Sequence, residues 1–189
     1  MTADPYEFLR QDPALRPLVD EHGEILIEPA SDPFERLVVS IVNQQLSTAS
    51  AAAIRDRLFD RFEVTPDGLL AADEDALRDV GLSSQKVRYV RSVAAHFDDG
   101  VAIADYADMT DDEVIDDLTT ITGVGTWTAK MFLIFVLARE DVFPVEDLGI
   151  RRGMEAVVGE MTRAEMVDRA EVWRPYRSYA SRYLWRAVD

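Results

Sequence analysis

The sequence predicts an all-α fold, and three observations predict it. Helix-start signals recur along the 189 residues, the apolar residues between them repeat at helical spacing, and only one short stretch alternates like a strand. That stretch is the isolated fragment EILIEP at residues 24–29. Because 48% of the residues are hydrophobic, the chain has enough apolar side chains for a core of its own. We therefore expect a bundle of helices joined by short connections.

The first strong helix signal lies at residues 32–42. Asp32 can cap the helix, Pro33 suits its first turn, and Glu35 can complete a capping box. Apolar residues then recur at helical spacing and form one face, made of Phe34, Leu37, Val38, Ile41 and Val42. We expect this helix to continue through the alanine-rich stretch at residues 47–59.

Two further helical stretches are predicted before residue 98. Thr65 and Pro66 begin the first, which ends at Gly81, a residue type suited to a C-terminal stop. Ser83 or Ser84 opens the second, whose inward face is formed by Val87, Val90, Ala94 and Phe97.

The second half of the chain carries four more helix signals. Two are capping boxes, each a threonine followed three residues later by a glutamate, at Thr110 with Glu113 and at Thr162 with Glu165. Residues 126–140 are apolar nearly all round, which is typical of a helix buried at the centre of a helical domain. Pro175 is expected to begin the last helix.

The chain is acidic, with 36 acidic and 20 basic residues and a formal net charge of -16. This balance argues against nucleic-acid binding through lysine and arginine alone. The acidic residues are spread along most of the chain, as in salt-adapted halophilic proteins, so the charge can reflect habitat. Only Lys86 and Lys130 are lysines, whereas residues 151–189 carry eight arginines and six acidic residues. Candidates for phosphate or fold contacts in this basic stretch are Arg151, Arg152, Arg174 and Arg177.

The composition excludes several kinds of site. The sequence contains no cysteine, which excludes disulfides, cysteine-ligated zinc and a thiolate-held iron-sulfur cluster. The first residues lack an apolar run behind a basic start, and the longest apolar run, MFLIFVLA, is too short to span a bilayer. We expect a cytoplasmic protein with no membrane partner.

Residues 118–131, LTTITGVGTWTAKM, place two glycines between two helical stretches. Glycine ends helices by adopting positive φ, so the pair can simply form a tight corner. Alternatively, the lack of side chains lets a phosphate reach the backbone amides of Gly123, Val124, Gly125 and Thr126. Such contacts would bind DNA without reading its sequence. The spacing alone leaves both interpretations open.

Four segments give the sequence a resemblance to a known family. The hairpin resembles the helix-hairpin-helix of the HhH-GPD DNA glycosylase superfamily, and residues 143–153, FPVEDLGIRRG, resemble the segment that carries its catalytic aspartate. IVNQQLSTASAAAI at residues 41–54 and WRPYRSYASRYLWR at residues 173–186 match in the same order. Within the superfamily the sequence is similar to the 3-methyladenine DNA glycosylase II family, which removes alkylated bases.

The resemblance implies one HhH-GPD glycosylase unit over residues 1–189, with two helical lobes and a cleft between them. The expected lobes are residues 34–142, which contain the hairpin, and residues 1–33 together with 143–189. The resemblance also implies a monomer that acts on double-stranded DNA containing alkylated bases. Because the N-terminal mixed domain of the bacterial enzyme has no counterpart in this sequence, we expect a minimal form.

Asp147 stands where a helix is expected to begin, so it fits an ordinary N-cap worth about 1 kcal/mol. The resemblance implies that Asp147 is also the essential carboxylate of the glycosylase. Cleavage of an N-glycosidic bond builds positive charge on the sugar, which a carboxylate stabilises while it orients the attacking water. The adjacent Glu146 is expected to be solvated.

The resemblance further implies which residues surround the flipped base. Trp127 and Trp185 would line the base pocket and hold a cationic base against their rings, at roughly 0.5–2 kcal/mol each. Met131 and Arg186 stand where the bacterial enzyme has tyrosines, which makes this pocket less aromatic. Trp127 occupies the place of the catalytic lysine of glycosylase-lyases, and an indole cannot form a Schiff base. Lys130 is the alternative nucleophile.

Two further sites are implied by position. A flipped nucleotide leaves a gap in the base stack, and the family fills it with a side chain that would be Gln44, Gln45 or Leu46 here. We prefer Gln45, although paired glutamines also suit the exposed end of an apolar helix. At the hairpin the family holds a monovalent cation, Na⁺ or K⁺, through backbone carbonyls that correspond to Thr119, Ile121 and Val124. The chemistry itself needs no cofactor.

Two other functions stay open on the sequence. The first is a bifunctional glycosylase/AP lyase for another lesion, with Lys130 as its nucleophile. The second is a non-catalytic helix-hairpin-helix module that binds damaged or branched DNA. Asp147 and the two tryptophans argue against the module, because a binding protein needs none of them for catalysis.

Overall fold

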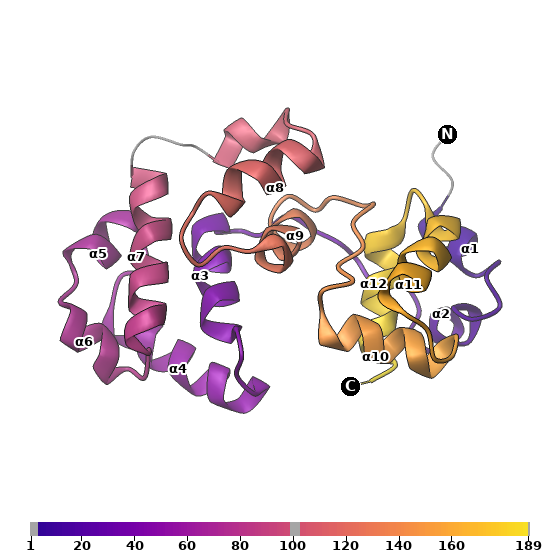
Figure 1. The fold of residues 1–189 in the computed structure, drawn as a ribbon, viewed down its shortest axis with the longest axis horizontal. Helices are drawn as coiled ribbons and strands as arrows, with labels where there is room; N and C mark the ends of the chain where they lie inside the picture. The colour runs from indigo at the N-terminus through magenta and orange to yellow at the C-terminus, as the bar shows by residue number, and fades with distance from the viewer. Residues whose placement is uncertain (1–3, 99–102, 189) are drawn as a thin grey trace. The chain divides into compact units, whose positions relative to one another are not determined.

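The computed structural model of the chain describes residues 4–98 and 103–188, in which every regular element is a helix (Figure 1). Residues 24–29 form no strand. The chain divides into two compact units, a central unit of residues 29–137 and a terminal unit of residues 1–28 and 138–189. The boundaries between the units therefore fall at 28/29 and 137/138, where the expected lobes had 33/34 and 142/143.

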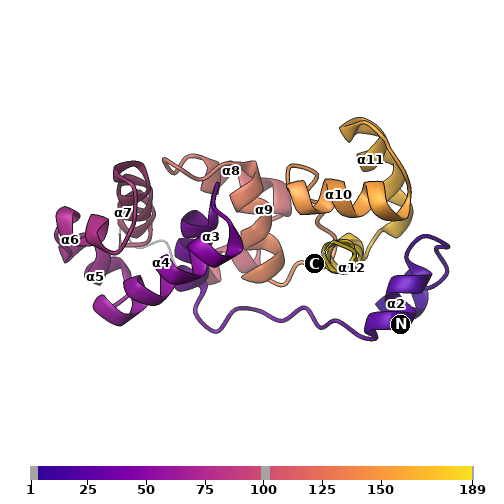
Figure 2. The same cartoon turned by 90° about the horizontal axis from the view of Figure 1, so that it is seen from below.

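The central unit is built around α7 and α9. Helix α7 (Ser84–Asp98) packs against α3 (Pro33–Asn43), α5 (Pro66–Ala71) and α6 (Glu74–Asp79). Helix α9 (Thr126–Phe135) packs against α3 and α8 (Asp111–Thr119), and α4 (Thr48–Arg61) packs against α3 (Figure 2). A short 3-10 helix, η1 (Ile103–Ala107), precedes α8.

Several local signals act as predicted. The Asp32 side chain accepts a hydrogen bond from the Glu35 backbone amide at the start of α3, with Pro33 in the first turn. The capping box at Thr110 forms completely, and Gly81 ends its helix with a φ of 108°. The apolar face of α3 is buried, and so are Phe132, Leu133 and Ile134 of α9.

The prediction of one continuous helix from residue 33 to 59 is wrong. Helix α3 ends at Asn43, and α4 begins after Ser47, whose side chain caps it. Between them Gln45 has a φ of +56°, in the left-handed region that a helix does not use. Tertiary hydrogen bonds to this segment, described below, replace the helical ones, which is why local propensity did not decide its structure.

Two other helices are shorter than the sequence predicts. The stretch from Thr65 to Gly81 breaks because Asp73 starts a new helix by accepting a hydrogen bond from the Ala76 amide. Helix α9 ends at Phe135, and Ala138 has a φ of +54°, which a helix does not use. Beyond this point the backbones of Glu140 and Val142 bond to Ser178.

The terminal unit combines both ends of the chain. Its helices are α1 (Pro5–Leu9), α2 (Arg16–His22), α10 (Leu148–Val157), α11 (Arg163–Ala170), the 3-10 helix η2 (Glu171–Trp173) and α12 (Arg177–Arg186). The capping box at Thr162 forms as predicted. The last helix begins at Arg177 and not at Pro175. At this start, the Asp141 carboxylate accepts hydrogen bonds from the backbone and the side chain of Arg177. None of the helices in the described chain has the length and apolar character needed to cross a bilayer.

Asp12 joins the N-terminal segment to the rest of the terminal unit. Its Oδ2 atom lies 2.6 Å from Nη2 of Arg169 and 2.9 Å from Nε1 of Trp173, which is itself fully buried. Burial of the Asp12 carboxyl acts to raise its pKa, but the hydrogen bonds from Arg169 and Trp173 outweigh it, and the pKa is lowered. A lowered pKa means that the charged form stabilises the fold.

Replacing Asp12 by Asn is expected to reduce the free energy of unfolding by about 1–3 kcal/mol at pH 7, because the neutral amide has one acceptor oxygen for donors that now share two. The wild-type advantage should be complete above about pH 4 and should shrink as the pH falls through the lowered folded pKa. Urea unfolding of the wild type and of Asp12→Asn at several pH values measures this difference in the free energy of unfolding.

Asp20→Asn is the matched control, since Asp20 pairs with Arg10 at 2.6 Å but both side chains are about half exposed. Its effect should stay below about 1 kcal/mol. Equal losses in the two variants would show that Asp12 is an ordinary surface partner.

Candidate active site

Asp147 is the N-cap of α10, and its carboxylate receives two hydrogen bonds. Oδ2 lies 3.0 Å from the backbone nitrogen of Ile150 and 2.9 Å from Nε1 of Trp185. The first bond is the N-cap expected from sequence, and the second comes from a residue 38 positions later on α12. Asp147 therefore caps its helix and contacts one of the predicted pocket tryptophans within a single unit.

The packing of α10 on α12 brings these two side chains together. A Cβ on Gly149 would lie 2.8 Å from Cδ1 of Trp185 and 2.9 Å from Oδ2 of Asp147, so only glycine leaves room for both groups. One helical turn later, a Cβ on Gly153 would overlap the backbone of Leu184. Two glycines on one face of α10 thus allow the close approach on which the contact depends.

Arg151 fixes the segment that leads into Asp147. Its Nη1 atom donates to the backbone carbonyl of Glu146 at 2.8 Å, and the carbonyl of Val145 lies 3.4 Å away. Asp147 also donates its backbone N–H to the carbonyl of Pro144 at 2.9 Å. Of the two roles left open for Arg151 by the sequence, the structure shows the fold contact.

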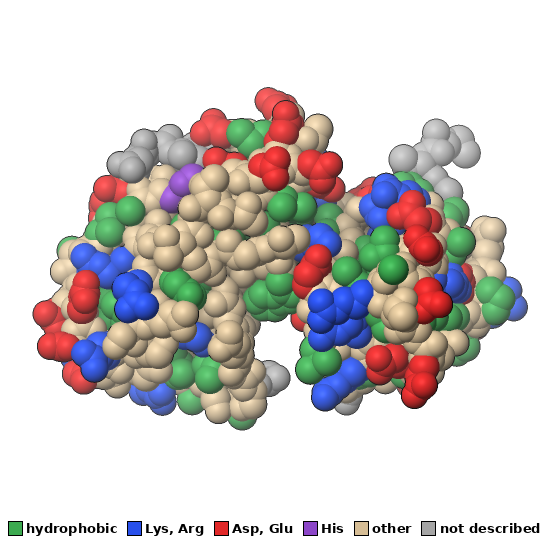
Figure 3. Space-filling model, in the orientation of Figure 1, with side chains coloured by type: hydrophobic (Ala, Val, Ile, Leu, Met, Phe, Trp, Pro, Cys, Tyr) green, Lys and Arg blue, Asp and Glu red, His purple; other side chains and the backbone are tan. Residues whose placement is uncertain are grey.

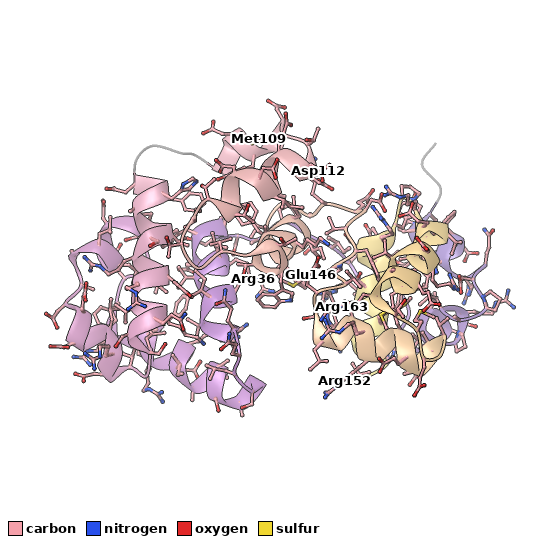
Figure 4. The ribbon with its side chains drawn as sticks, in the orientation of Figure 1. Arg36, Met109, Asp112, Glu146, Arg152 and Arg163 are labelled. Carbon is pink, nitrogen blue, oxygen red and sulfur yellow. The ribbon has the colours of Figure 1, made fainter. Side chains whose placement is uncertain are left out.

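Other predicted pocket residues differ in their exposure. Arg186 is exposed on the last turn of α12, directly after the half-buried Trp185. Trp127 is half-buried in the first turn of α9, whereas Met131 lies in the core of the central unit with 6% of its surface exposed. Arg152 and Arg163 are exposed and project from the α10 and α11 part of the terminal unit (Figure 4).

The glycine hairpin joins α8 to α9 inside the central unit. Gly123 has a φ of 95°, and a Cβ there would overlap the ring of Tyr89. Gly125 is the exposed N-cap of α9 and makes no side-chain cap, and Thr126 beside it is exposed as well. Val124 is instead buried, and its amide bonds to the Ile121 carbonyl at 3.0 Å.

The segment after α3 lies against this hairpin. Nε2 of Gln44 donates to the Gly123 carbonyl at 3.1 Å and to Oγ1 of Thr128 at 3.0 Å. Gln45 is exposed, and a left-handed φ in a non-glycine residue costs about 1–3 kcal/mol unless its surroundings hold it. A pocket of about 430 Å³ opens here, lined by Gln44, Gln45, Gln85, Lys86, Tyr89, Gly123, Val124, Gly125, Trp127 and Thr128.

The hairpin offers oxygen ligands at the end of α8. Thr119 is the last residue of α8, where helix-terminal carbonyls lack intrahelical partners, and Ile121 follows within the turn, where its carbonyl accepts a bond from the Val124 amide. Backbone carbonyls of this kind suit a hard cation. Among the described residues no group of three His, Asp or Glu side chains could hold a metal ion.

The surface near the hairpin carries acidic side chains as well as the positive end of the α9 dipole. On the face shown in Figure 3, acidic side chains gather over α8, the helix that leads into the hairpin. The first turn of α9 carries the partial positive charge of its helix dipole, and Lys86 lines the pocket beside the hairpin.

A helical fold with a glycine hairpin between α8 and α9, and an aspartate that caps α10, is the arrangement expected of a helix-hairpin-helix DNA repair protein. The family model described as "HhH-GPD superfamily base excision DNA repair protein" matches residues 38–176, and the chain belongs to this superfamily. Within it, the chain belongs to the DNA-3-methyladenine glycosylases.

Two curated relatives illustrate the membership. DNA-3-methyladenine glycosylase 1 of Schizosaccharomyces pombe is 32% identical over 82% of this chain and 72% of its own length. The DNA-3-methyladenine glycosylase of Saccharomyces cerevisiae is 30% identical over 96% of this chain and 68% of its own length.

Solved structures share the fold. The S. pombe 3-methyladenine DNA glycosylase in complex with abasic DNA has a TM-score of 0.87 and 29% identity, over 96% of this chain and 95% of that one. The DNA-3-methyladenine glycosidase of Bacillus halodurans has a TM-score of 0.82 and 35% identity, over 98% and 90% of the two chains. The all-helical glycosylase fold predicted from the sequence is confirmed.

Replacing Gly123 by Ala is expected to destabilise the central unit by about 1–3 kcal/mol, because the side chain meets both a left-handed φ and the Tyr89 ring. Gly125→Ala is the matched control, since nothing lies within 4 Å of a Cβ there and its φ is negative. It should cost less than about 1 kcal/mol. Urea unfolding measures both, and equal losses would contradict the close contact at Gly123.

Proposed function

We propose that the protein is a monofunctional DNA glycosylase that hydrolyses the N-glycosidic bond of alkylated purines of the 3-methyladenine type in double-stranded DNA. The observation that carries this proposal is the Asp147 carboxylate, held by Ile150 and Trp185 at the start of α10. The membership of the chain among the DNA-3-methyladenine glycosylases supports it. The reaction would begin base excision repair.

Asp147 acts through charge and orientation in this proposal. As the bond between C1′ and the base nitrogen breaks, its electron pair leaves with the base and C1′ becomes electron-deficient. The carboxylate stabilises that positive charge, and water adds to C1′ and gives up a proton to bulk water, since the cationic base leaves as a neutral molecule. Both observed hydrogen bonds to Asp147 end on Oδ2, so they fix the plane of the carboxylate before the substrate arrives.

Selection of the base rests on the tryptophans in this proposal. An alkylated purine such as 3-methyladenine is cationic, so an electron-rich ring, that of Trp185 in the terminal unit or that of Trp127 in the central unit, favours it over a normal base. The bond from Trp185 to Asp147 gives that indole a second role, since the same ring would contact the base and orient the carboxylate. Met131 and Arg186 stay proposed pocket residues that supply shape and charge.

DNA binding rests on the hairpin in this proposal. Amides of Gly123, Gly125 and Thr126 at the hairpin and the start of α9 meet a phosphate, and the dipole of α9 favours its negative charge. The Val124 amide, predicted to join them, is instead bonded to the Ile121 carbonyl within the turn. The carbonyls of Thr119, Ile121 and Val124 would hold a Na⁺ or K⁺ ion, which strengthens the contact with the phosphate. We propose that the protein acts as a monomer, with Gln45 as the side chain that fills the gap in the stack.

Replacing Asp147 by Asn is expected to abolish release of methylated bases from alkylated duplex DNA while DNA binding is retained. Asparagine caps a helix as well as aspartate does, so the fold should survive and only the charge is lost. Chromatography of released bases and a binding assay measure the two effects. Glu146→Gln is the neighbouring control and should retain activity, whereas full activity of Asp147→Asn would exclude Asp147 from the chemistry.

Reduction with borohydride during the reaction is expected to trap no covalent complex between protein and DNA. Trp127 cannot form a Schiff base, and the product should be an intact strand with an abasic site. Denaturing gels of protein and DNA measure both. A trapped complex that disappears in Lys130→Met would instead establish the bifunctional glycosylase/AP lyase.

A further inference from the structure

The turn at residues 43–46 presents Gln45 in an unusual backbone conformation. Gln44 has φ and ψ of -53° and 130°, Gln45 has a φ of +56°, and the Leu46 amide lies 3.4 Å from the Asn43 carbonyl. These values describe a type II turn, whose third position normally requires glycine or asparagine. The side chain of Gln45 is exposed at this third position. Groups outside the turn must therefore hold Gln45 in this conformation.

Lys86, in the first turn of α7, contacts the turn from one side. Its Nζ atom donates to the carbonyl of Val42 at 2.5 Å and to the carbonyl of Gln44 at 2.7 Å. Val42 lies in the last turn of α3, so the ammonium also neutralises carbonyls at the negative end of that helix. Lys86 is half-buried where it reaches these carbonyls, and this burial lowers its pKa.

Gln44 fastens the same turn from the other side. Its side-chain nitrogen uses both N–H groups, toward the Gly123 carbonyl and toward Oγ1 of Thr128. The residue before Gln45 is thus held at its backbone by α7 and at its side chain by the hairpin and α9. All of these groups belong to the central unit.

We propose that Lys86 is a positioning residue for Gln45: its ammonium fixes the turn at residues 43–46 so that Gln45 is presented in one conformation for insertion into the base stack. This proposal rests on the proposed DNA glycosylase function. Lys86 acts through the turn and not as a phosphate ligand, since its ammonium makes two short bonds to carbonyl oxygens of the protein. A fixed Gln45 loses little conformational entropy when it enters the stack.

Hydrogen exchange tests, without DNA, whether Lys86 holds the turn at residues 43–46. In Lys86→Met the amides of residues 44–46 should exchange about tenfold faster than in the wild type, while those of α9 are unchanged. Arg88→Met is the matched control, because Arg88 is an exposed cation two residues later on the same helix. It should leave residues 44–46 unchanged. Unchanged exchange in Lys86→Met would overturn the proposal.

A double-mutant cycle tests the link to excision. Lys86→Met and Gln45→Ala should each slow single-turnover base release from duplex DNA by about tenfold, and the double variant should be no slower than either single one. Multiplied effects would overturn the proposal, because they would mean that Lys86 acts independently of Gln45. Arg88→Met reports the loss of one positive charge alone and should change the rate less than about twofold.

Two further arms keep the outcomes separate. If Lys86→Met fails to fold, Lys86→Gln repeats both measurements, because its shorter amide cannot reach both carbonyls. If the wild-type protein releases no methylated base, the proposed function fails, and hydrogen exchange still decides whether Lys86 fastens the turn. Faster exchange in residues 44–46 combined with an unchanged excision rate would overturn the positioning role.

Discussion

The close approach of α10 and α12 is the constraint on which the proposed catalytic group depends. Gly153 admits the backbone of Leu184, and Gly149 leaves space for the indole of Trp185 beside Asp147. Any side chain at Gly149 would separate the indole nitrogen from the carboxylate or turn the carboxylate away from its helix. The absence of a Cβ at Gly149 and at Gly153 thus allows α10 and α12 to pack closely, and the hydrogen bond from Trp185 to Asp147 is a consequence of this packing.

In the central unit, too, a glycine allows a close contact. Gly123 lets the hairpin rest on the Tyr89 ring, and this contact fixes the turn that exposes the first amides of α9. An anion can then be bound by backbone dipoles in a chain whose net charge is -16. Phosphate binding by fixed amides does not require a basic surface, so an acidic composition does not contradict a DNA-binding function.

The sequence predicts what local chemistry decides. Caps at Asp32, Thr110 and Asp147 were predictable because a side chain and an amide three residues later are enough to form them. The break after Asn43 was not, since Lys86 and the hairpin hold that turn from distant positions. The contact of Trp185 with Asp147 also spans 38 residues and no local pattern marks it, although the family resemblance pointed to both residues. Long-range hydrogen bonds therefore separate the predictable part of the site from the rest.

The sequence position of Asp147 suggests both a helix N-cap and the essential carboxylate of a glycosylase, and these two roles are compatible. An N-cap holds its carboxylate against the helix with one oxygen, at the positive end of the α10 dipole. The bond to Trp185 ends on that same oxygen, so the cap and the indole orient the carboxylate together. A carboxylate on a loop would have to be ordered when a substrate binds, whereas the Asp147 carboxylate is already ordered by the helix that it begins. The same reasoning applies to Gln45, which is held by groups that have no part in the chemistry.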